Sequence, residues 1–183
     1  MRNTFQGLLK LDFALSDQIR ERAGKNGWRR LATLLAHSGD SWVWAAGLGL
    51  VWLFSQGALH RYTAILEISV VLQALLVFAI KKLFGRKRPG GQDGTIYRQF
   101  DPHSFPSGHA TRAALLAVLA LSLGPAWFGW LITAWAPLVC LSRVMTGLHY
   151  LSDILGGVAL GLVLGAVVVL VHPLWVAWFP FLF

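Results

Sequence analysis

The feature that most limits the fold of this chain is a series of long apolar stretches that carry almost no charge. One of them, residues 151–171, contains a single charged side chain, Asp153. Four more cover about 31–54, 62–80, 106–123 and 126–141. Roughly 20 apolar residues in a helix cross the hydrocarbon core of a bilayer. We therefore expect an all-α, polytopic membrane helical bundle with about five transmembrane helices, or six.

Composition supports the same fold class. The chain has 183 residues, of which 56% are hydrophobic and 13% are charged, whereas about a quarter of a typical soluble domain is charged. A chain this short has too little interior to bury so much apolar surface away from water. The composition argues against a soluble enzyme and against a disordered chain. With no linker visible, residues 1–183 are expected to form a single integral-membrane domain.

The N-terminal segment 1–30 has a different pattern. Leu8, Leu11, Leu15 and Ile19 fall on one face of a helix over residues 5–22, with charged side chains elsewhere. This pattern predicts an amphipathic helix lying in the membrane interface; a helix packed on the protein itself is the alternative. The first apolar stretch is interrupted at residues 37–40, where a histidine and an aspartate are expected to pair or to cap a helix.

The charge balance is strongly basic, with 16 Lys and Arg against 8 Asp and Glu and a net charge of +8. Such an excess fits nucleic acid, an anionic membrane surface or an anionic substrate. The basic residues gather in 2–30 and 81–112, beside the apolar stretches. This location favours the bilayer and a lipid phosphate as partners and not nucleic acid; the oligomeric state stays open.

The connection from residue 81 to 105 is polar, Gly-rich and basic, while the other turns are short. Long loops in compact proteins usually carry function. With five spans, this loop and the turn between the fourth and fifth spans emerge on the same membrane face. That face is where the chemistry is expected.

The segment 142–153 contains Arg143, His149 and Asp153. A histidine and a carboxylate four residues apart share one face of a helix. The carboxylate can then fix the tautomer and leave Nε2 as a nucleophile or base; an ordinary helical ion pair is the alternative. An arginine at membrane depth needs an anionic partner, and a phosphate would accept bidentate hydrogen bonds from Arg143.

Two further segments carry candidate site residues. Residues 106–109, Pro-Ser-Gly-His, place Ser107, Gly108 and His109 at a helix N-terminus, where free N–H groups bind anions. Lys81 and Arg88 are seven residues apart at the end of a span and would stack on one side of a helix; a basic flank that sets topology is the alternative.

Together these segments supply cations, a helix N-terminus, two histidines and one orienting carboxylate, which suit phosphoryl transfer. The sequence lacks a carboxylate cluster for Mg²⁺ and any Cys/His spacing for zinc. No metal and no cofactor are expected. A non-catalytic protein that only binds anionic lipid is the alternative, but binding alone does not require the two histidines.

The three motifs, K-x6-R-P over 81–89, P-S-G-H over 106–109 and S-R-x5-H-x3-D over 142–153, resemble those of the type 2 phosphatidic acid phosphatase (PAP2) family, the lipid phosphate phosphatases. The resemblance implies that His149 attacks phosphorus to form a phosphohistidine, with Asp153 orienting it, and that His109 protonates the leaving group. It further implies that Lys81, Arg88, Ser107, Gly108 and Arg143 hold the phosphate without a metal.

The resemblance implies a lipid phosphatase of a bacterial cytoplasmic (inner) membrane. Its first candidate substrate is undecaprenyl diphosphate, followed by phosphatidylglycerol phosphate and phosphatidic acid; a lipid phosphotransferase on the same scaffold is the alternative. Many family members have six spans and a site on the outer face. The basic residues near the N-terminus instead favour the inner face, and we expect the outer face.

Overall fold

A computed structural model describes residues 2–25, 28–89 and 101–183 of the chain. Within these ranges the regular elements are helices and no strand is present. The helices are α1 (Arg2–Lys25), α2 (Arg29–Ser38), α3 (Ser41–Phe54), α4 (Gly57–Phe84), α6 (Gly108–Leu123), α7 (Ala126–Met145) and α8 (Leu151–Trp178). The predicted all-α class is confirmed.

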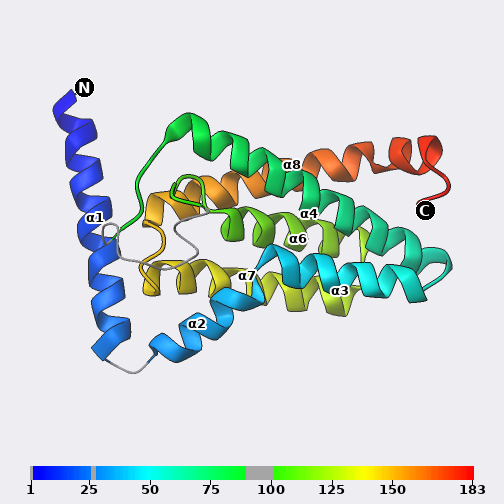
Figure 1. Cartoon of the computed structure of the whole chain (residues 1–183), viewed down its shortest axis with the longest axis horizontal. Coiled ribbons are helices and arrows are strands. Elements are labelled where there is room, and N and C mark those ends of the chain that lie inside the picture. The colour runs from blue at the N-terminus through cyan, green and yellow to red at the C-terminus, as the bar shows by residue number, and fades with distance from the viewer. Residues whose placement is uncertain (1, 26–27, 90–100) are drawn as a thin grey trace.

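Helices α3, α4, α6, α7 and α8 run side by side along the long axis of the molecule (Figure 1). α4, α7 and α8 have 28, 20 and 28 residues and are apolar enough to cross a membrane. α3 and α6, with 14 and 16 residues, are apolar but shorter than the ~30 Å hydrocarbon core requires. These five helices correspond to the five predicted apolar stretches.

The first stretch, 31–54, departs from a continuous span. It breaks at Gly39 and Asp40 into α2 and α3. Two indole N–H groups hold the break, because Trp44 donates to the carbonyl of Ser38 and Trp135 donates to its hydroxyl. This corner between α2 and α3 places Asp40 inside the bundle, where it is 7% exposed.

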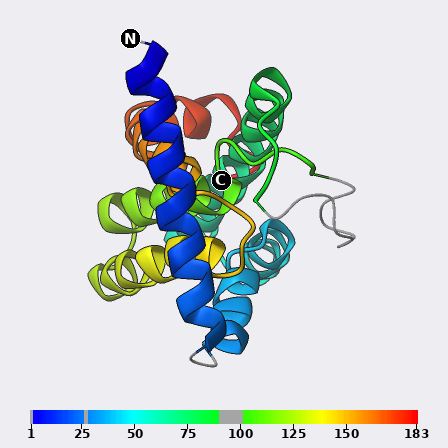
Figure 2. The same ribbon diagram turned by 90° about the vertical axis from the view of Figure 1, so that its left-hand side faces the viewer.

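α1 crosses one end of the bundle, opposite the C-terminus (Figures 1 and 2), and packs against α7 and α8. Its apolar Leu8 and Leu11 are more than half exposed, whereas Ser16 is buried. α1 therefore docks on the protein through Ser16, Ile19 and Ala23 and leaves Leu8 and Leu11 outward. The helix thus packs on the protein, and its location in the membrane interface stays a prediction.

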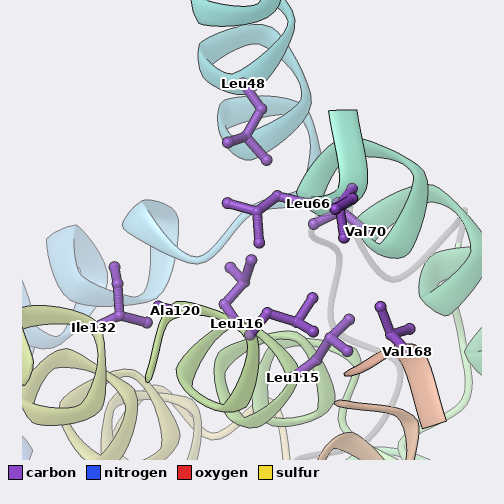
Figure 3. Packing of buried hydrophobic residues seen from close by; sticks show 10 residues of the cluster. Leu48, Leu66, Val70, Leu115, Leu116, Ala120, Ile132 and Val168 are labelled. Atoms are coloured by element: carbon purple, nitrogen blue, oxygen red, sulfur yellow. The ribbon is translucent and has the colours of Figure 1, made fainter. Parts of the chain in front are cut away.

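α6 occupies the centre of the bundle and contacts α4, α7 and α8. Leu115 and Leu116 of α6 meet Leu66 of α4, Ile132 of α7 and Val168 of α8 in one apolar cluster (Figure 3). These residues are at most 8% exposed. The buried core fixes where α6 begins, and therefore where the Pro-Ser-Gly-His motif lies.

Small residues let α8 approach α6 closely. A Cβ added to Gly157 would lie 2.6 Å from the carbonyl oxygen of Ser107, and one added to Gly165 would lie 2.7 Å from Cβ of Val118. Between them, a Cβ on Gly161 would overlap the carbonyl oxygen of Thr111. Close backbone approach of this kind is typical of membrane helices, and it holds the starts of α6 and α8 together.

Candidate active site

The three motifs meet at the end of the bundle that α1 crosses, where α4 and α7 end and α6 and α8 begin. The predicted site residues with side chains are all at most 6% exposed: Lys81, Arg88, Ser107, His109, Arg143, His149 and Asp153. Gly108, the first residue of α6, is partly exposed. Burying this many polar groups costs free energy unless they are paired.

Lys81 and Arg88 converge by a different route from the one expected. α4 ends at Phe84, and Gly85 follows with φ of 60°, in the left-handed region that suits glycine. Arg88 is therefore not on the helix, and the prediction that the two side chains stack on α4 is wrong. The chain turns back after Gly85, which brings Arg88 to the same carboxylate as Lys81.

That carboxylate belongs to Asp101. Its Oδ2 accepts a hydrogen bond from Arg88 Nη2 at 2.7 Å and another from Lys81 Nζ. Asp101 lies in the loop before the Pro-Ser-Gly-His motif, and its side chain is 28% exposed. Asp101 thus occupies the donors that we expected to bind phosphate. Its position after the long basic loop carried no signal for this role.

His149 lies in the turn between α7 and α8 and accepts a hydrogen bond at Nε2 from Arg88 Nη1, at 3.1 Å. Because a guanidinium only donates, Nε2 carries no proton and keeps a lone pair. Burial and the positive charges of Arg88, Arg143 and Lys81 hold the pKa of His149 well below its ordinary value. The imidazole is neutral, as a nucleophile must be.

Asp153 lies near His149 but is bound mainly by other groups. Its Oδ2 is 3.6 Å from His149 Nδ1 and accepts the N–H of Tyr150 at 2.9 Å. His149 precedes α8, so the prediction that the pair shares a helix face is wrong; the capping turn at Tyr150 brings the two side chains together instead.

Arg86, inside the first motif, was missed by sequence reasoning. It donates to Asp153 Oδ1 at 2.7 Å and to Asp12 Oδ2 of α1 at 2.8 Å. Its guanidinium also lies 4.4 Å from the centre of the Tyr150 ring. Arg86 therefore links α1 to the carboxylate beside His149. No periodicity in the sequence could reveal a contact between residues so far apart in the chain.

The remaining anion-binding groups are Arg143, Ser107 and the start of α6. Arg143 lies in the last turn of α7, and its carbonyl accepts the N–H of His149 at 3.3 Å. Ser107 caps α6 by accepting the N–H of Ala110, as expected for a helix start. Its own N–H donates to the carbonyl of Asp153 at 3.0 Å.

His109 points toward the corner between α2 and α3. Its Nε2 is 2.7 Å from Asp40 Oδ1, and Asp40 Oδ2 is 2.9 Å from His37 Nδ1. The expected pairing of His37 with Asp40 is present, but the contact to His109 was not foreseen. An acidic residue inside an apolar stretch was the available signal.

A cavity of about 150 Å³ opens beside His109 and is lined by Lys81, Asp101, Arg112 and Gly108. Lys81 and Arg112 give this cavity positive charge, which Asp101 partly offsets. Among the residues that the structure describes, no group of three His, Cys, Asp or Glu side chains lies close enough to hold a metal ion. Metal-independent chemistry stays a prediction.

Comparison with known proteins identifies the family of the chain. Residues 61–177 match the family model described as the PAP2 superfamily. The chain belongs to the PAP2 superfamily. The match covers the three motifs and the helices that carry them, so the resemblance seen in the sequence is confirmed.

Several curated relatives act on lipid phosphates. Decaprenylphosphoryl-5-phosphoribose phosphatase of Mycobacterium tuberculosis is 32% identical over 138 residues, covering 73% of this chain and 75% of the relative. Undecaprenyl-diphosphatase of Sulfolobus acidocaldarius is 30% identical, covering 72% of this chain and 64% of the relative. Lipid A 1-phosphatase of Rhizobium etli is 38% identical over 54% of this chain and 45% of its own length.

Two solved structures share the fold. LpxE of Aquifex aeolicus superposes with a TM-score of 0.69 at 22% identity, over 86% of this chain and 94% of the other. A PAP2-type phosphatidylglycerolphosphate phosphatase of Bacillus subtilis gives 0.64 at 22% identity, over 88% and 84%. This PAP2 protein is an integral membrane protein and a lipid phosphatase.

Proposed function

We propose that the chain hydrolyses a phosphate ester or diphosphate of a membrane lipid through a phosphohistidine on His149, without a metal ion. The observation that carries this proposal is the hydrogen bond from Arg88 to His149 Nε2, at 3.1 Å. Nε2 of His149 is therefore unprotonated and can act as a nucleophile. The Arg88 guanidinium can then donate to a phosphate oxygen in place of Nε2. Lys81 and Arg143 bring further positive charge to the same place.

In the first step, Nε2 of His149 bonds to the terminal phosphorus, the bond from that phosphorus to the leaving oxygen breaks, and His109 gives this oxygen a proton. The leaving oxygen belongs to the lipid alcohol in a monoester and to the lipid monophosphate in a diphosphate. Arg88, Lys81 and Arg143 stabilise the charge on the other phosphate oxygens, helped by Ser107 and the N–H groups at Gly108. In the second step a water attacks phosphorus, His109 takes its proton, and the P–N bond breaks to release phosphate. Asp153 orients His149 throughout.

We further propose that the lipid is a polyprenyl diphosphate such as undecaprenyl diphosphate. The names of the Mycobacterium and Sulfolobus relatives both refer to polyprenyl phosphates, which supports this choice. Phosphatidylglycerol phosphate and phosphatidic acid are the other candidates. The apolar faces of α4 and α8 would keep the lipid tail in the bilayer. The proposed location is the outer face of a bacterial cytoplasmic membrane.

The substrate class is tested with a panel of lipid phosphates assayed for phosphate release from the purified protein in detergent. We expect the highest kcat/KM with the polyprenyl diphosphate, with no added acceptor. Phosphate release that needs an added lipid or sugar acceptor would identify a phosphotransferase. A preference for phosphatidic acid or phosphatidylglycerol phosphate would overturn the substrate assignment but leave the mechanism.

The nucleophile is tested by His149→Ala. We expect phosphate release to fall to background because His149 supplies the nucleophilic nitrogen, while folding in detergent is retained. His172→Ala is the matched control, since His172 bonds the carbonyl of Val169 within α8. Full activity in the His149 variant would contradict the proposed intermediate.

A further inference from the structure

The corner between α2 and α3 lies outside the three motifs, yet it contacts a proposed catalytic group. Asp40 precedes α3, where an aspartate usually caps the helix with its side chain. Here its carboxylate makes no capping hydrogen bond. Instead it lies 2.7 Å from His109 Nε2. Helix capping therefore does not account for this buried acid.

We propose that Asp40 is a positioning residue for His109, and that His37 holds the second oxygen of the same carboxylate. The corner would thus make Nδ1 of His109 the atom that exchanges protons with the substrate. This inference rests on the acid–base role given to His109 under the proposed function. The proposed phosphate-binding motifs do not include Asp40 or His37.

The state of the carboxylate is set by its two imidazole partners. Burial alone would raise the pKa of Asp40, but the hydrogen bonds from His109 and His37 outweigh it and lower that pKa to about 2. Asp40 therefore stays ionised and accepts a proton from His109 Nε2–H. The hydrogen bond at one ring nitrogen decides which nitrogen carries the proton, so Nδ1 is the acceptor in the neutral ring.

The charges around His109 explain why a carboxylate is needed. Arg112 on α6 and Arg143 on α7 act on it with positive charge, and Lys81 on α4 lines the same cavity, with Asp101 beside it. His149 also interacts electrostatically with His109. Such cations disfavour the imidazolium that must protonate the leaving oxygen. The contact with Asp40 stabilises it.

The corner is held firmly against His109. Arg112 donates from Nε and Nη2 to the carbonyl of Gly39, at 3.0 and 2.6 Å. A Cβ on Gly39 would lie only 3.0 Å from His109 Cδ2 and 2.9 Å from Val139 Cγ1. His37, whose side chain is 65% exposed, closes the chain of hydrogen bonds on the solvent side.

During the reaction the proton on Nδ1 would pass to the lipid oxygen as the P–O bond breaks, and a proton from water would return to Nδ1 as the P–N bond breaks. Nε2–H would stay bonded to Asp40 throughout. Asp40→Asn removes the charge, and its amide can donate to Nε2, which places the ring proton on Nδ1 in the neutral state and removes the base.

The test compares a lipid phosphomonoester such as phosphatidic acid, whose alkoxide must be protonated, with 4-nitrophenyl phosphate, whose nitrophenolate leaves unprotonated. For Asp40→Asn we expect first-turnover cleavage of the lipid phosphate to fall about 100-fold, a typical contribution of general acid catalysis, while the initial nitrophenolate burst stays close to wild type. KM should change little. His37→Ala should give a smaller loss in the same direction.

Asp17→Asn serves as the control, because Asp17 pairs with Arg20 on the outer part of α1, and it should match wild type. Equal losses for both substrates in Asp40→Asn would make Asp40 structural and overturn the inference. If His109→Ala shows the leaving-group effect and Asp40→Asn does not, the inference alone fails. If His109→Ala cleaves the lipid phosphate normally, the proposed role of His109 fails.

Discussion

At the scale of single residues, the site is a set of buried charges that are balanced by one another. Arg88 contacts both His149 and Asp101, and Asp40 contacts both His109 and His37. Asp101 therefore offsets the positive charge of Arg88, and Asp40 partners the two imidazoles. In the proposed site, a phosphate competes with Asp101 for the donors Lys81 and Arg88, while Asp40 stays in place.

This competition predicts the effect of Asp101→Asn. Removing the negative charge weakens the contact that phosphate has to displace, so we expect KM for the lipid phosphate to fall about tenfold, equivalent to about 1.4 kcal/mol. The measurement is steady-state phosphate release in detergent, with Glu21→Gln on α1 as the control. A higher KM together with a lower kcat would show that Asp101 holds the cations in place for substrate.

At the scale of elements, polar contacts join α1 to the start of α8, next to the turn that carries His149. Asp12 Oδ1 accepts the N–H of Ser152 at 3.0 Å, and Ser16 Oγ accepts that of Leu151 at 3.0 Å. Both N–H groups belong to the first turn of α8, where helices leave such donors without an intrahelical partner. α1 thus completes the start of α8 and supports the turn that carries His149.

Asp12 makes this docking sensitive to acid. Burial would raise the pKa of Asp12, but hydrogen bonds from Ser152 and Arg86 lower it overall. A carboxyl group whose pKa is lowered by folding stabilises the folded state at pH values above its unfolded pKa of about 3.9. This stabilisation is lost as the pH falls through the pKa of the folded state.

Asp12→Asn should therefore unfold more easily than wild type at pH 7, by about 1–3 kcal/mol for a charged hydrogen-bond partner. The difference should shrink below pH ~4, as the unfolded carboxyl and then the folded one, whose pKa is lower, become protonated. Thermal unfolding in detergent at a series of pH values measures it. A difference that is independent of pH would contradict the role of the Asp12 charge.

The packing of α8 on α6 is the second element-level feature. Gly161→Ala places a Cβ against the backbone of Thr111, which cannot move without shifting α6. We expect a loss of about 1–3 kcal/mol, typical of an overpacked contact, and lower activity because the two helix starts separate. Gly49→Ala is the control, since a Cβ there meets nothing within 4 Å. Equal thermal stability of the two variants would contradict close packing.

At the scale of the whole molecule, the bundle gathers positive charge at the end that α1 crosses. Lys81, Arg88 and Arg143 are each at most 6% exposed, and their mutual repulsion is relieved when an anion binds. A ligand that binds only the folded state stabilises it by about 2.7 kcal/mol at 100 times its Kd.

Orthovanadate, which can adopt the five-coordinate geometry of the phosphoryl transition state, should therefore raise Tm of the wild-type protein. We expect the rise to persist in EDTA, because the proposed site uses no metal, and to be lost in Arg143→Ala. A rise that EDTA abolishes and Mg²⁺ restores would contradict the metal-free site.

The sequence predicted much of the fold and the chemistry because both leave local patterns. Inside a bilayer the backbone N–H and C=O groups must be hydrogen-bonded within the protein, so the apolar stretches had to become helices. The three motifs could be recognised from their residue spacing. Sequence alone therefore determined the membrane bundle, the PAP2 resemblance and the candidates His109 and His149.

Tertiary structure decided which charged residues meet. The route of Arg88 back from Gly85, the contact of Asp101 with Lys81, and the pairing of Asp40 with His109 join residues as many as 69 positions apart. Such contacts follow from how α3, α4 and α6 pack, not from periodicity within one helix. The physical reason is that a buried charge needs a partner close to it in three dimensions, and residue spacing along the chain does not identify that partner.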